Sequence, residues 1–346
     1  MINVKKEGVL LEKTALGFEH AAVINPAVWQ SGNDVHLLYR AVRRGNFSTI
    51  GFCRLHGPLD VVQRDAVPLI IPQHPYESQG MEDPRVVKLA DTFYFSYTAY
   101  DGINALGALA VSNDLRHFEK KGIIVPQLCF KRFGELVQSG LKVNEKYFRE
   151  YREYIVRGLP ADTMNVWDKN IVFFPERIDG NLAFLHRIRP GIQLVLAKDI
   201  PEDLTPEFWE QYLLHFSDQV VMEPRYPHES SYIGGGCPPL LTDEGWLLIY
   251  HSVHDSPAGY VYHACAALLD RGNPRREIAR LPYPLFSPET EWEKNGYVKN
   301  VVFPTGTAVF GDRLYIYYGA ADSRVAVASL SMKELLGALL KSKINL

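Results

Sequence analysis

The sequence predicts an all-β fold, a five-bladed β-propeller with a few helical insertions, in a single domain over residues 1–346. Two observations support this prediction. A strand pattern recurs five times along the chain, and aromatic residues make up 12% of the sequence, a share that suits a sheet protein. Radial repetition of similar strands is typical of propellers. The alternative is a set of ordinary hairpins in two β-sandwich domains.

Each repeat begins at a turn residue and continues as an alternating aromatic and aliphatic run, a pattern that indicates a β-strand. The runs are VHLLYR after Asp34, TFYFSYTAYD after Asp91, NLAFLHR after Gly180, WLLIYHS after Gly245 and RLYIYYGAAD after Asp312. They start about 60–65 residues apart, with one longer interval before the third run. Equivalent repeats would gather their polar ends around one axis. Those ends are Tyr39-Arg40, Tyr100-Asp101, His186-Arg187, Tyr250-His251 and Gly319 to Asp322.

Three segments have helical patterns. The region of about 128–160 fills the longer interval and has charged residues between aromatics at helical spacing, which predicts a helical insertion on one blade. Thr205 and Pro206 form an N-cap and a first turn, so we expect a helix over 205–216. Ser331 followed by an apolar stripe predicts a C-terminal helix at about 331–342.

Composition narrows the classes of partner. The chain has 37 Lys and Arg against 40 Asp and Glu, a net charge of −3, and lacks the positive excess that non-specific nucleic-acid binding needs. No apolar stretch is long enough to span a membrane, and no signal peptide is apparent. The four cysteines form no C-x-x-C pair, which argues against zinc. We expect a cytoplasmic protein with reduced cysteines and no nucleic-acid or membrane partner.

The segment GMEDPR at 80–85 is the first candidate for chemistry. It places the adjacent carboxylates Glu82 and Asp83 before a proline, with Arg85 behind them. Such an arginine holds one carboxylate ionised while the neighbouring group acts as an acid. The alternative is a plain turn, because Asp-Pro is a common turn dipeptide.

A second candidate combines Asp168-Lys169-Asn170 with LHRIR at 185–189. The two cationic clusters have the spacing of two strands joined by a hairpin. Converging Lys and Arg side chains form an anion site, and Arg binds phosphate through two parallel hydrogen bonds. The alternative is a solvated strand edge.

The remaining motifs are weaker. The glycine-rich IGGGCPP at 233–239 permits close backbone approach but lacks the ending of a phosphate-binding loop. Asn25-Pro26, Arg40 and Asp322 place an amide, a guanidinium and a carboxylate at strand ends. The histidines His251, His254 and His263 do not have the spacing of a metal site, so we expect no metal. No G-x-S-x-G motif supports a serine hydrolase.

In combination, these motifs resemble glycoside hydrolase family 130, the β-mannoside phosphorylases and their hydrolase relatives. The similarity runs from Asn25 to Asp322, nearly the whole chain. It includes Asn25-Pro26, LLYR, EDPR, Lys169-Asn170 with FFPE, LHR, IGGGCPP, GWLLIYH, AALLD, NVVFPTG and YYGAAD. The resemblance implies a five-bladed propeller, in agreement with the repeats.

The resemblance also implies roles for individual residues. Asp83 resembles the general acid, which protonates the glycosidic oxygen through the mannose 3-hydroxyl. Asn25, Arg40 and Asp322 resemble the residues that hold the mannose, and we assign Arg85 to substrate binding as well. Inorganic phosphate is a co-substrate, with no other cofactor. It attacks with inversion to give α-mannose 1-phosphate from a β-mannoside. The positions that match the phosphate site are Lys169, Asn170, Arg187, His251 and Tyr262.

The sequence departs from the family pattern at the phosphate site. Tyr232 stands where typical phosphorylases have a lysine, and Lys169 stands where many have an arginine. The site is therefore weaker by about one cation, for which a protonated His251 would compensate. Two alternatives stay open: an inverting β-mannosidase, with Glu229 as candidate base and Glu223 and Asp255 behind it, or a non-catalytic sugar-binding propeller. Retention of the other phosphate-site cations favours phosphorolysis. The substrate is expected to be a small oligosaccharide, and the sequence leaves the linkage and the oligomeric state open.

Overall fold

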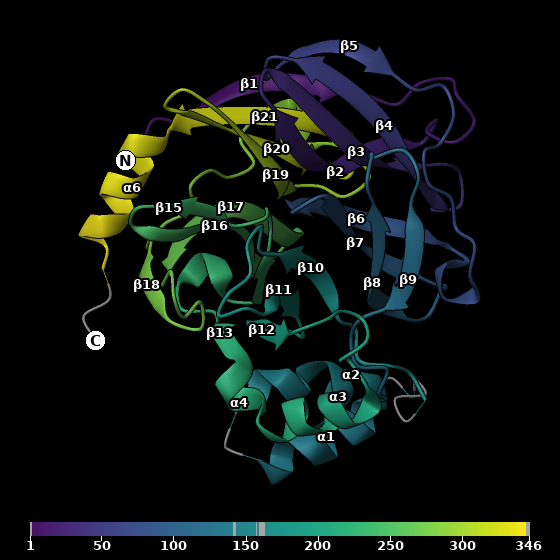
Figure 1. Cartoon of the computed structure of the whole chain (residues 1–346), viewed down its shortest axis with the longest axis vertical. Coiled ribbons are helices and arrows are strands. Elements are labelled where there is room, and N and C mark those ends of the chain that lie inside the picture. Colours follow the sequence, from purple (N-terminus) through teal and green to yellow (C-terminus); the bar gives the residue numbers. More distant parts are fainter. Residues whose placement is uncertain (1, 141–142, 157, 159–162, 344–346) are drawn as a thin grey trace.

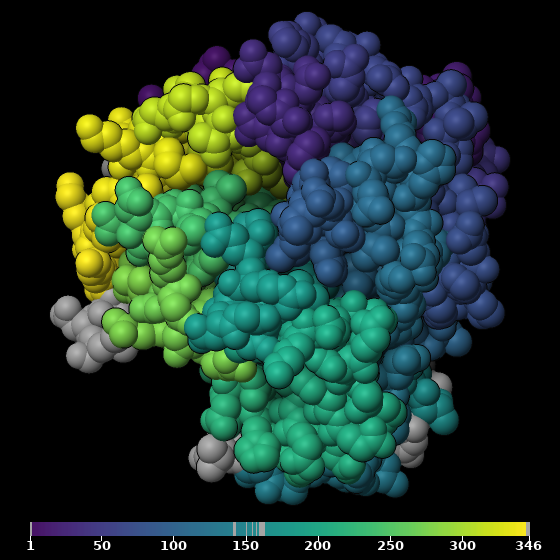
Figure 2. Space-filling model, in the orientation of Figure 1, coloured from purple at the N-terminus to yellow at the C-terminus, as the bar shows by residue number. Residues whose placement is uncertain are grey.

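The strands of this protein follow one another around a central axis (Figure 1). The computed structural model describes residues 2–140, 143–156, 158 and 163–343. Figure 2 shows the same order on the molecular surface, where the N-terminal and C-terminal segments lie next to each other. Within the described residues the strands form five blades, and the predicted fold class is confirmed.

Each blade is an antiparallel sheet whose strands follow in sequence order from the axis outward, except that the last blade is completed by the N-terminal strand. Blade 1 contains β2 (Ala22–Ser31), β3 (Asp34–Val42), β4 (Ser48–His56) and β5 (Asp60–Arg64). Blade 2 contains β6 (Gly80–Leu89), β7 (Thr92–Tyr100), β8 (Ala105–Ser112) and β9 (Glu119–Ile123). Blade 3 contains β10 (Lys169–Phe173), β11 (Leu182–Arg187), β12 (Ile192–Ala197) and β13 (Val220–Met222).

The last two blades vary this plan. Blade 4 contains β14 (Tyr232–Gly235), β16 (Gly245–Ser256), β17 (Gly259–Leu269) and β18 (Glu277–Arg280), with the short β15 (Leu240–Thr242) beside β16. Blade 5 contains β19 (Val302–Phe310), β20 (Arg313–Ala320), β21 (Arg324–Ser331) and β1 (Lys5–Leu11). Because β1 pairs with β21, the two ends of the described chain close the ring in one sheet.

The second strand of every blade is one of the five predicted runs, and the same buried polar pair marks it in four blades of the described structure. A tyrosine on that strand donates its hydroxyl hydrogen to a glutamate in the segment that leads into the blade. The pairs are Tyr39 with Glu19 (2.7 Å), Tyr97 with Glu77 (2.9 Å), Tyr250 with Glu229 (2.5 Å) and Tyr318 with Glu293 (2.7 Å). Each glutamate also pairs with a cation, in order Arg64, Lys120, Arg280 and Lys6. Blade 3 has His186 with Asp168 at 2.7 Å instead.

These pairs correct the predicted alignment of the strand ends. The residue after the paired side chain is Arg40, Thr98, Arg187, His251 and Gly319 in the five blades. Tyr100-Asp101 is therefore not equivalent to Tyr39-Arg40, because the residue equivalent to Tyr39 is Tyr97, three positions before Tyr100. Asp101 instead accepts hydrogen bonds from the amides of Ile103 and Asn104 in the turn after the strand.

The helices lie outside the ring. In the predicted insertion the chain forms α1 (Phe130–Ser139), a 3-10 helix η2 (Glu145–Phe148) and α2 (Arg149–Val156). These helices gather beside blade 3 with α3 (Pro206–Leu214) and α4 (Phe216–Gln219) (Figure 1), and the rings of Phe133 and Phe216 meet edge to face at 5.7 Å. Thr205 caps α3 and Ser331 caps α6 (Met332–Lys341), as expected. Shorter helices are η1 (Pro75–Glu77), η3 (Pro227–Glu229) and α5 (Glu291–Lys294).

Apolar side chains fill the space between neighbouring blades. One buried cluster joins the insertion helices to blades 2 and 3, and another joins blades 4 and 5 to α6. This packing holds the first strand of each blade, called the inner strand below, in a fixed position around the axis. The inner strands are β2, β6, β10, β14 and β19. In the part of the chain that the structure describes, no helix is long and apolar enough to cross a membrane.

Candidate active site

The inner strands of blades 1, 2 and 3 share a local irregularity that points a polar side chain at the axis. Asn25, Asp83 and Asn170 have positive φ angles of 49°, 48° and 56°. Each lies at a register shift in the pairing of its strand with the next. Asn and Asp tolerate this left-handed conformation better than other residues with a side chain, and a bulge redirects a side chain out of the sheet. Asn25, Asp83 and Asn170 thus occupy equivalent positions in three blades.

Asn25 and Asp83 are joined directly. The amide nitrogen of Asn25 donates to a carboxylate oxygen of Asp83 at 2.6 Å. The neighbouring blade makes room for this pair because Gly319 lacks a side chain, and a Cβ there would collide with the Asn25 amide oxygen. Gly234 is needed in the same way, since a Cβ would lie 2.6 Å from the His251 ring and 2.8 Å from the Asn170 amide oxygen.

A pocket of about 660 Å³ opens at this end of the axis. Residues from all five blades line it, among them six of the predicted site residues: Asn25, Arg40, Asp83, Lys169, Tyr262 and Asp322. Glu82, Phe303 and the exposed Tyr297 line it as well. The structure therefore brings the sugar-site candidates and part of the phosphate-site candidates together.

Asn170, Arg187 and His251 are buried beside this pocket. Asn170 follows Lys169 in β10, and Lys169 is paired in register with Arg187 of β11. The His251 ring lies 4.5 Å from the Phe303 ring and 6.3 Å from the Tyr262 ring. Several buried polar atoms here lack a hydrogen-bond partner among the described residues. They are the amide oxygens of Asn25 and Asn170, Nη2 of Arg85 and both ring nitrogens of His251. Buried polar groups are normally paired, so this cluster suits a polar ligand.

Glu82 connects the two halves of the site. One of its carboxylate oxygens accepts from Arg40 Nη2 at 2.7 Å, and the other lies 3.3 Å from Lys169 Nζ. Arg40 belongs to the sugar-site candidates and Lys169 to the phosphate-site candidates. In the sequence Glu82 is one of the two adjacent carboxylates of GMEDPR, and no pattern links it to residues of two other blades.

Two of the carboxyl groups that line the pocket, Asp83 and Asp322, differ in their ionisation. Burial opposes ionisation of Asp83, but the positive charges of Arg40, Lys169 and Arg85 and the Asn25 hydrogen bond hold its pKa below the usual value. Burial raises the pKa of Asp322 to about 6, where the attraction of Arg40 opposes the repulsion of Asp83 and Glu82. Asp83 is therefore ionised in the empty pocket.

Arg85 lies under the pocket and holds the backbone in place. Its guanidinium donates to the carbonyl oxygens of Asp83, Pro84 and Gly236, and burial lowers its pKa to about 10. It also contributes to the low pKa of Asp83, as the motif predicts. The pocket wall as described does not include its side chain, and the assignment of Arg85 to substrate binding stays a prediction.

Without phosphate, His251 is a neutral ring and does not supply the missing cation. Burial, together with the positive charges of Arg187, Arg85 and Arg189, keeps the pKa of His251 well below its usual value. The neutral ring can still donate from one nitrogen and accept at the other. The nearby Arg189 ends the cationic run LHRIR at 185–189, but the family resemblance did not include it among the phosphate-site residues.

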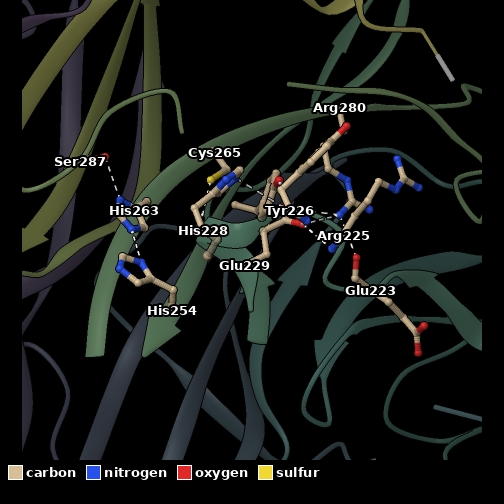
Figure 3. A network of polar contacts seen from close by, with 12 residues as sticks. Glu223, Arg225, Tyr226, His228, Glu229, His254, His263, Cys265, Arg280 and Ser287 are labelled. Carbon is tan, nitrogen blue, oxygen red and sulfur yellow. Dashed lines mark hydrogen bonds and ion pairs between the residues drawn. The ribbon is translucent and has the colours of Figure 1, made fainter. Parts of the chain in front are cut away.

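Glu229 lies outside the pocket, in the structural pair of blade 4. Figure 3 shows it beside Arg225, Tyr226 and Arg280, in a network that also includes Glu223. Its carboxylate accepts from the backbone amides of Arg225 and Tyr226, from the Tyr250 hydroxyl and from Arg280. Every one of these contacts is buried or partly buried, and Glu229 itself is fully buried. This geometry contradicts the role of base that the sequence suggested, because no part of Glu229 faces the pocket.

Away from the axis, His254, His263 and Ser287 are linked by hydrogen bonds in a separate row (Figure 3). A ring nitrogen of His254 lies 2.9 Å from one of His263, whose other nitrogen lies 2.8 Å from the Ser287 hydroxyl. Among the described residues there is no group of three side chains arranged to hold a metal ion.

A pocket that pairs an ionised carboxylate with a carboxyl of raised pKa, next to arginines and unpaired polar atoms, suits a sugar and an anion together. Such a pocket on the axis of a five-bladed propeller defines an enzyme that acts on glycosides. The chain belongs to glycoside hydrolase family 130: the family model described as "beta-1,4-mannooligosaccharide phosphorylase" matches residues 14–341.

Curated relatives agree with this family. The chain is 30% identical to a 1,2-beta-oligomannan phosphorylase of Thermoanaerobacter sp. (strain X514), over 97% of this chain and 99% of that protein. It is 28% identical to a beta-1,2-mannobiose phosphorylase of the same organism, over 92% of each chain.

Solved structures share the fold. The beta-1,2-mannobiose phosphorylase of Listeria innocua, in complex with beta-1,2-mannobiose, superposes with a TM-score of 0.72 at 23% identity, covering 98% of this chain and 99% of that one. A structure described with the family's glycoside hydrolases that target beta-1,2 mannosidic linkages in Candida mannan gives a TM-score of 0.73 at 22% identity, covering 96% of this chain and 94% of that one. The fold thus accompanies both phosphorolysis and hydrolysis, and the choice between them depends on the site.

Proposed function

We propose that this protein is an inverting phosphorylase that cleaves a β-mannoside with inorganic phosphate and releases α-mannose 1-phosphate. The proposal rests on the cluster of positively charged side chains on one side of the site, called the positive wall below. The positive charges of Arg187, Arg85 and Arg189 lower the pKa of the buried His251. Lys169 adds a fourth cation, because it lies directly across from Arg187 in the β10–β11 pairing. A water nucleophile needs a carboxylate base at this wall, whereas phosphate needs cations.

The pocket residues take the following roles. Asn25, Arg40 and Asp322 hold the mannose, and Asp83 lies beside them with Asn25 fixing its orientation. A phosphate oxygen attacks the anomeric carbon from the side of Lys169 and Arg187, and the bond to the leaving sugar breaks. The leaving oxygen takes a proton from the mannose 3-hydroxyl, which Asp83 replaces. Phosphate is already an anion, so the step needs no general base.

Asp83 needs a proton before it can act as the acid. Lys169 and the arginines keep it ionised while the pocket is empty. A bound phosphate dianion cancels part of their positive charge, and the pKa of Asp83 then rises. Binding of the co-substrate therefore prepares the acid, which links proton donation to the presence of phosphate.

The test is a product assay with β-1,2-, β-1,3- and β-1,4-linked mannobioses and longer β-1,2-linked oligomannosides, with and without about 10 mM phosphate, an excess over typical KM values of ~1 mM or less. The β-1,2 substrates come first because the relatives that match over most of their length are named for them. Mannose 1-phosphate that forms only with phosphate, and not with Asp83→Asn, is the expected result. Free mannose in both reactions would instead establish hydrolysis, and binding without turnover of any substrate would indicate a sugar-binding propeller.

A further inference from the structure

We propose that Arg189 is a second guanidinium of the phosphate site, held there by Tyr232. The inference rests on the proposed phosphorolysis and adds to it a binding residue and the part played by a tyrosine that cannot itself supply a cation.

The ring of Tyr232 is the surface on which two arginines meet. Tyr232 begins β14 and is buried, at 2% exposed. Its ring centroid lies 5.0 Å from Cζ of Arg187, at the end of β11, and 4.0 Å from Cζ of Arg189. Both distances are within the range of a cation–π contact, which is strengthened by burial. One aromatic ring therefore brings a proposed phosphate ligand and Arg189 together.

The same ring is fixed to the pocket wall. The Tyr232 hydroxyl lies 2.6 Å from the hydroxyl of Tyr262, and Tyr262 lines the pocket. Tyr232 also meets the His251 ring edge to face, at 6.5 Å between centroids. The charge of Arg189 reaches both neighbours, since it contributes to the lowered pKa of His251 and opposes the rise in the pKa of Tyr262. Arg189 thus belongs to the same group of side chains as Arg187, His251 and Tyr262.

The chemistry of a stacked guanidinium suits an anion. A guanidinium that contacts a ring by its face keeps its N–H groups in the plane perpendicular to that contact, and a pair of parallel N–H groups matches two phosphate oxygens. Two such groups beside one another bind phosphate more tightly than one. The half-buried Arg189 is less enclosed than Arg187, which is 4% exposed, so it lies on the side of the site nearer to solvent.

The experiment measures the KM for inorganic phosphate and the KM for the mannoside separately, in the wild type and in Arg189→Ala. Loss of one charge-assisted hydrogen bond should raise the phosphate KM about ten- to a hundredfold, with less than a twofold change in the mannoside KM. Arg189→Lys should recover part of the loss, because it keeps the charge but not the paired N–H groups. Arg177→Ala is the matched control: Arg177 belongs to the same blade but bonds to carbonyls of the turn at the opposite end of the strands.

Variants of Tyr232 test whether its ring positions Arg189 or whether its hydroxyl itself binds phosphate. Tyr232→Phe keeps the stacking ring and should move the phosphate KM less than Arg189→Ala does, whereas Tyr232→Leu should raise it to a similar extent. The two effects should not add in the double variant Tyr232→Leu/Arg189→Ala, because both remove the same held guanidinium. Protection against thermal unfolding by inorganic phosphate gives a second readout that requires no turnover.

Two results would overturn the inference. One is an unchanged phosphate KM and unchanged phosphate protection in Arg189→Ala. The other is an equal rise in both KM values, which would show a general structural role. A wild-type enzyme that releases mannose regardless of phosphate contradicts the proposed function instead, so the two failures are distinguishable. If Arg189→Ala does not fold, Arg189→Lys and Tyr232→Leu carry the same comparison.

Discussion

At the scale of single residues, the site places two of its carboxyl groups, Asp83 and Asp322, in unequal environments within one pocket. Asp83 sits among cations and an amide donor, whereas Asp322 is buried with two other carboxylates nearby and only partly compensated. Because the pKa of Asp322 is raised by burial, the ionised carboxylate destabilises the folded protein. The pocket keeps this group although it lowers stability. Residues of this kind are where activity and stability are in conflict.

We predict that Asp322→Asn inactivates the enzyme and stabilises the fold. The folded-state pKa of about 6 exceeds the ordinary 3.8, so the wild type loses stability as pH rises between those values. The loss amounts to about 3 kcal/mol at pH 7, and the amide removes it. Thermal unfolding should show a higher Tm for the variant at pH 7.5 and a difference that shrinks toward pH 4. The exposed Asp91→Asn is the control, and a lower Tm for Asp322→Asn at pH 7.5 would contradict the prediction.

The site residues that the sequence located are those marked by local chemistry. Asn25, Asp83 and Asn170 belong to short polar motifs, two of them before a proline, and the family resemblance assigns them roles. Arg189 and Tyr232 meet only because two blades come together, and no local pattern records that contact. Glu229 was misassigned for the converse reason: a glutamate just before the glycine-rich run has the sequence position of a site residue, but its partner is Tyr250 of its own blade.

At the scale of elements, the Glu–Tyr pair explains why the second strands repeat and why the predicted strand end of blade 2 was misaligned. The second strands were found because each keeps strict alternation and buried aromatics. In blade 2, however, alternation continues to Tyr100, and only the contact of Tyr97 with Glu77 shows which residue is equivalent to Tyr39. The outer strand β13 (Val220–Met222) and the short β15 (Leu240–Thr242) are too brief to show a period, so the sequence did not reveal them.

We predict that Glu229→Gln destabilises the protein and leaves its chemistry intact. The substitution removes one of the two carboxylates that face the buried Arg280, at 3.1 Å, while Glu277 remains paired with it. The loss of this charge-assisted contact should lower the free energy of unfolding by about 2 kcal/mol. Denaturant unfolding measures that loss, and kcat/KM of the folded enzyme should stay within about twofold. Glu223→Gln, in the same segment but only partly buried, serves as the control. Loss of activity with unchanged stability would restore Glu229 as a base.

At the scale of the whole molecule, closure of the ring decides whether the pocket exists, because its lining comes from every blade. The N-terminal strand β1 completes blade 5 by pairing with β21. Lys6 of this strand also forms an ion pair with the buried Glu293. Glu293 in turn accepts from Tyr318 and from the backbone amides of Glu289 and Thr290, in the segment that leads to the pocket residues Tyr297 and Val298. A contact of the N-terminal strand with Glu293 thus supports a wall of the site.

Lys6 and its neighbour Lys5 provide a matched test of this closure. Lys6 is mostly buried with its partner, so Lys6→Ala leaves Glu293 charged and uncompensated inside the protein, at a cost of about 3 kcal/mol. Lys5 pairs with Glu7 at the surface, at 2.6 Å and 67% side-chain exposure, and Lys5→Ala should change stability by less than about 1 kcal/mol. Thermal unfolding at pH 7 should therefore separate two adjacent lysines on one strand. Because protonated Glu293 no longer needs its partner, the deficit of Lys6→Ala should diminish in acid. Equal Tm values for the two variants would show that the ring closes through the β1–β21 pairing alone.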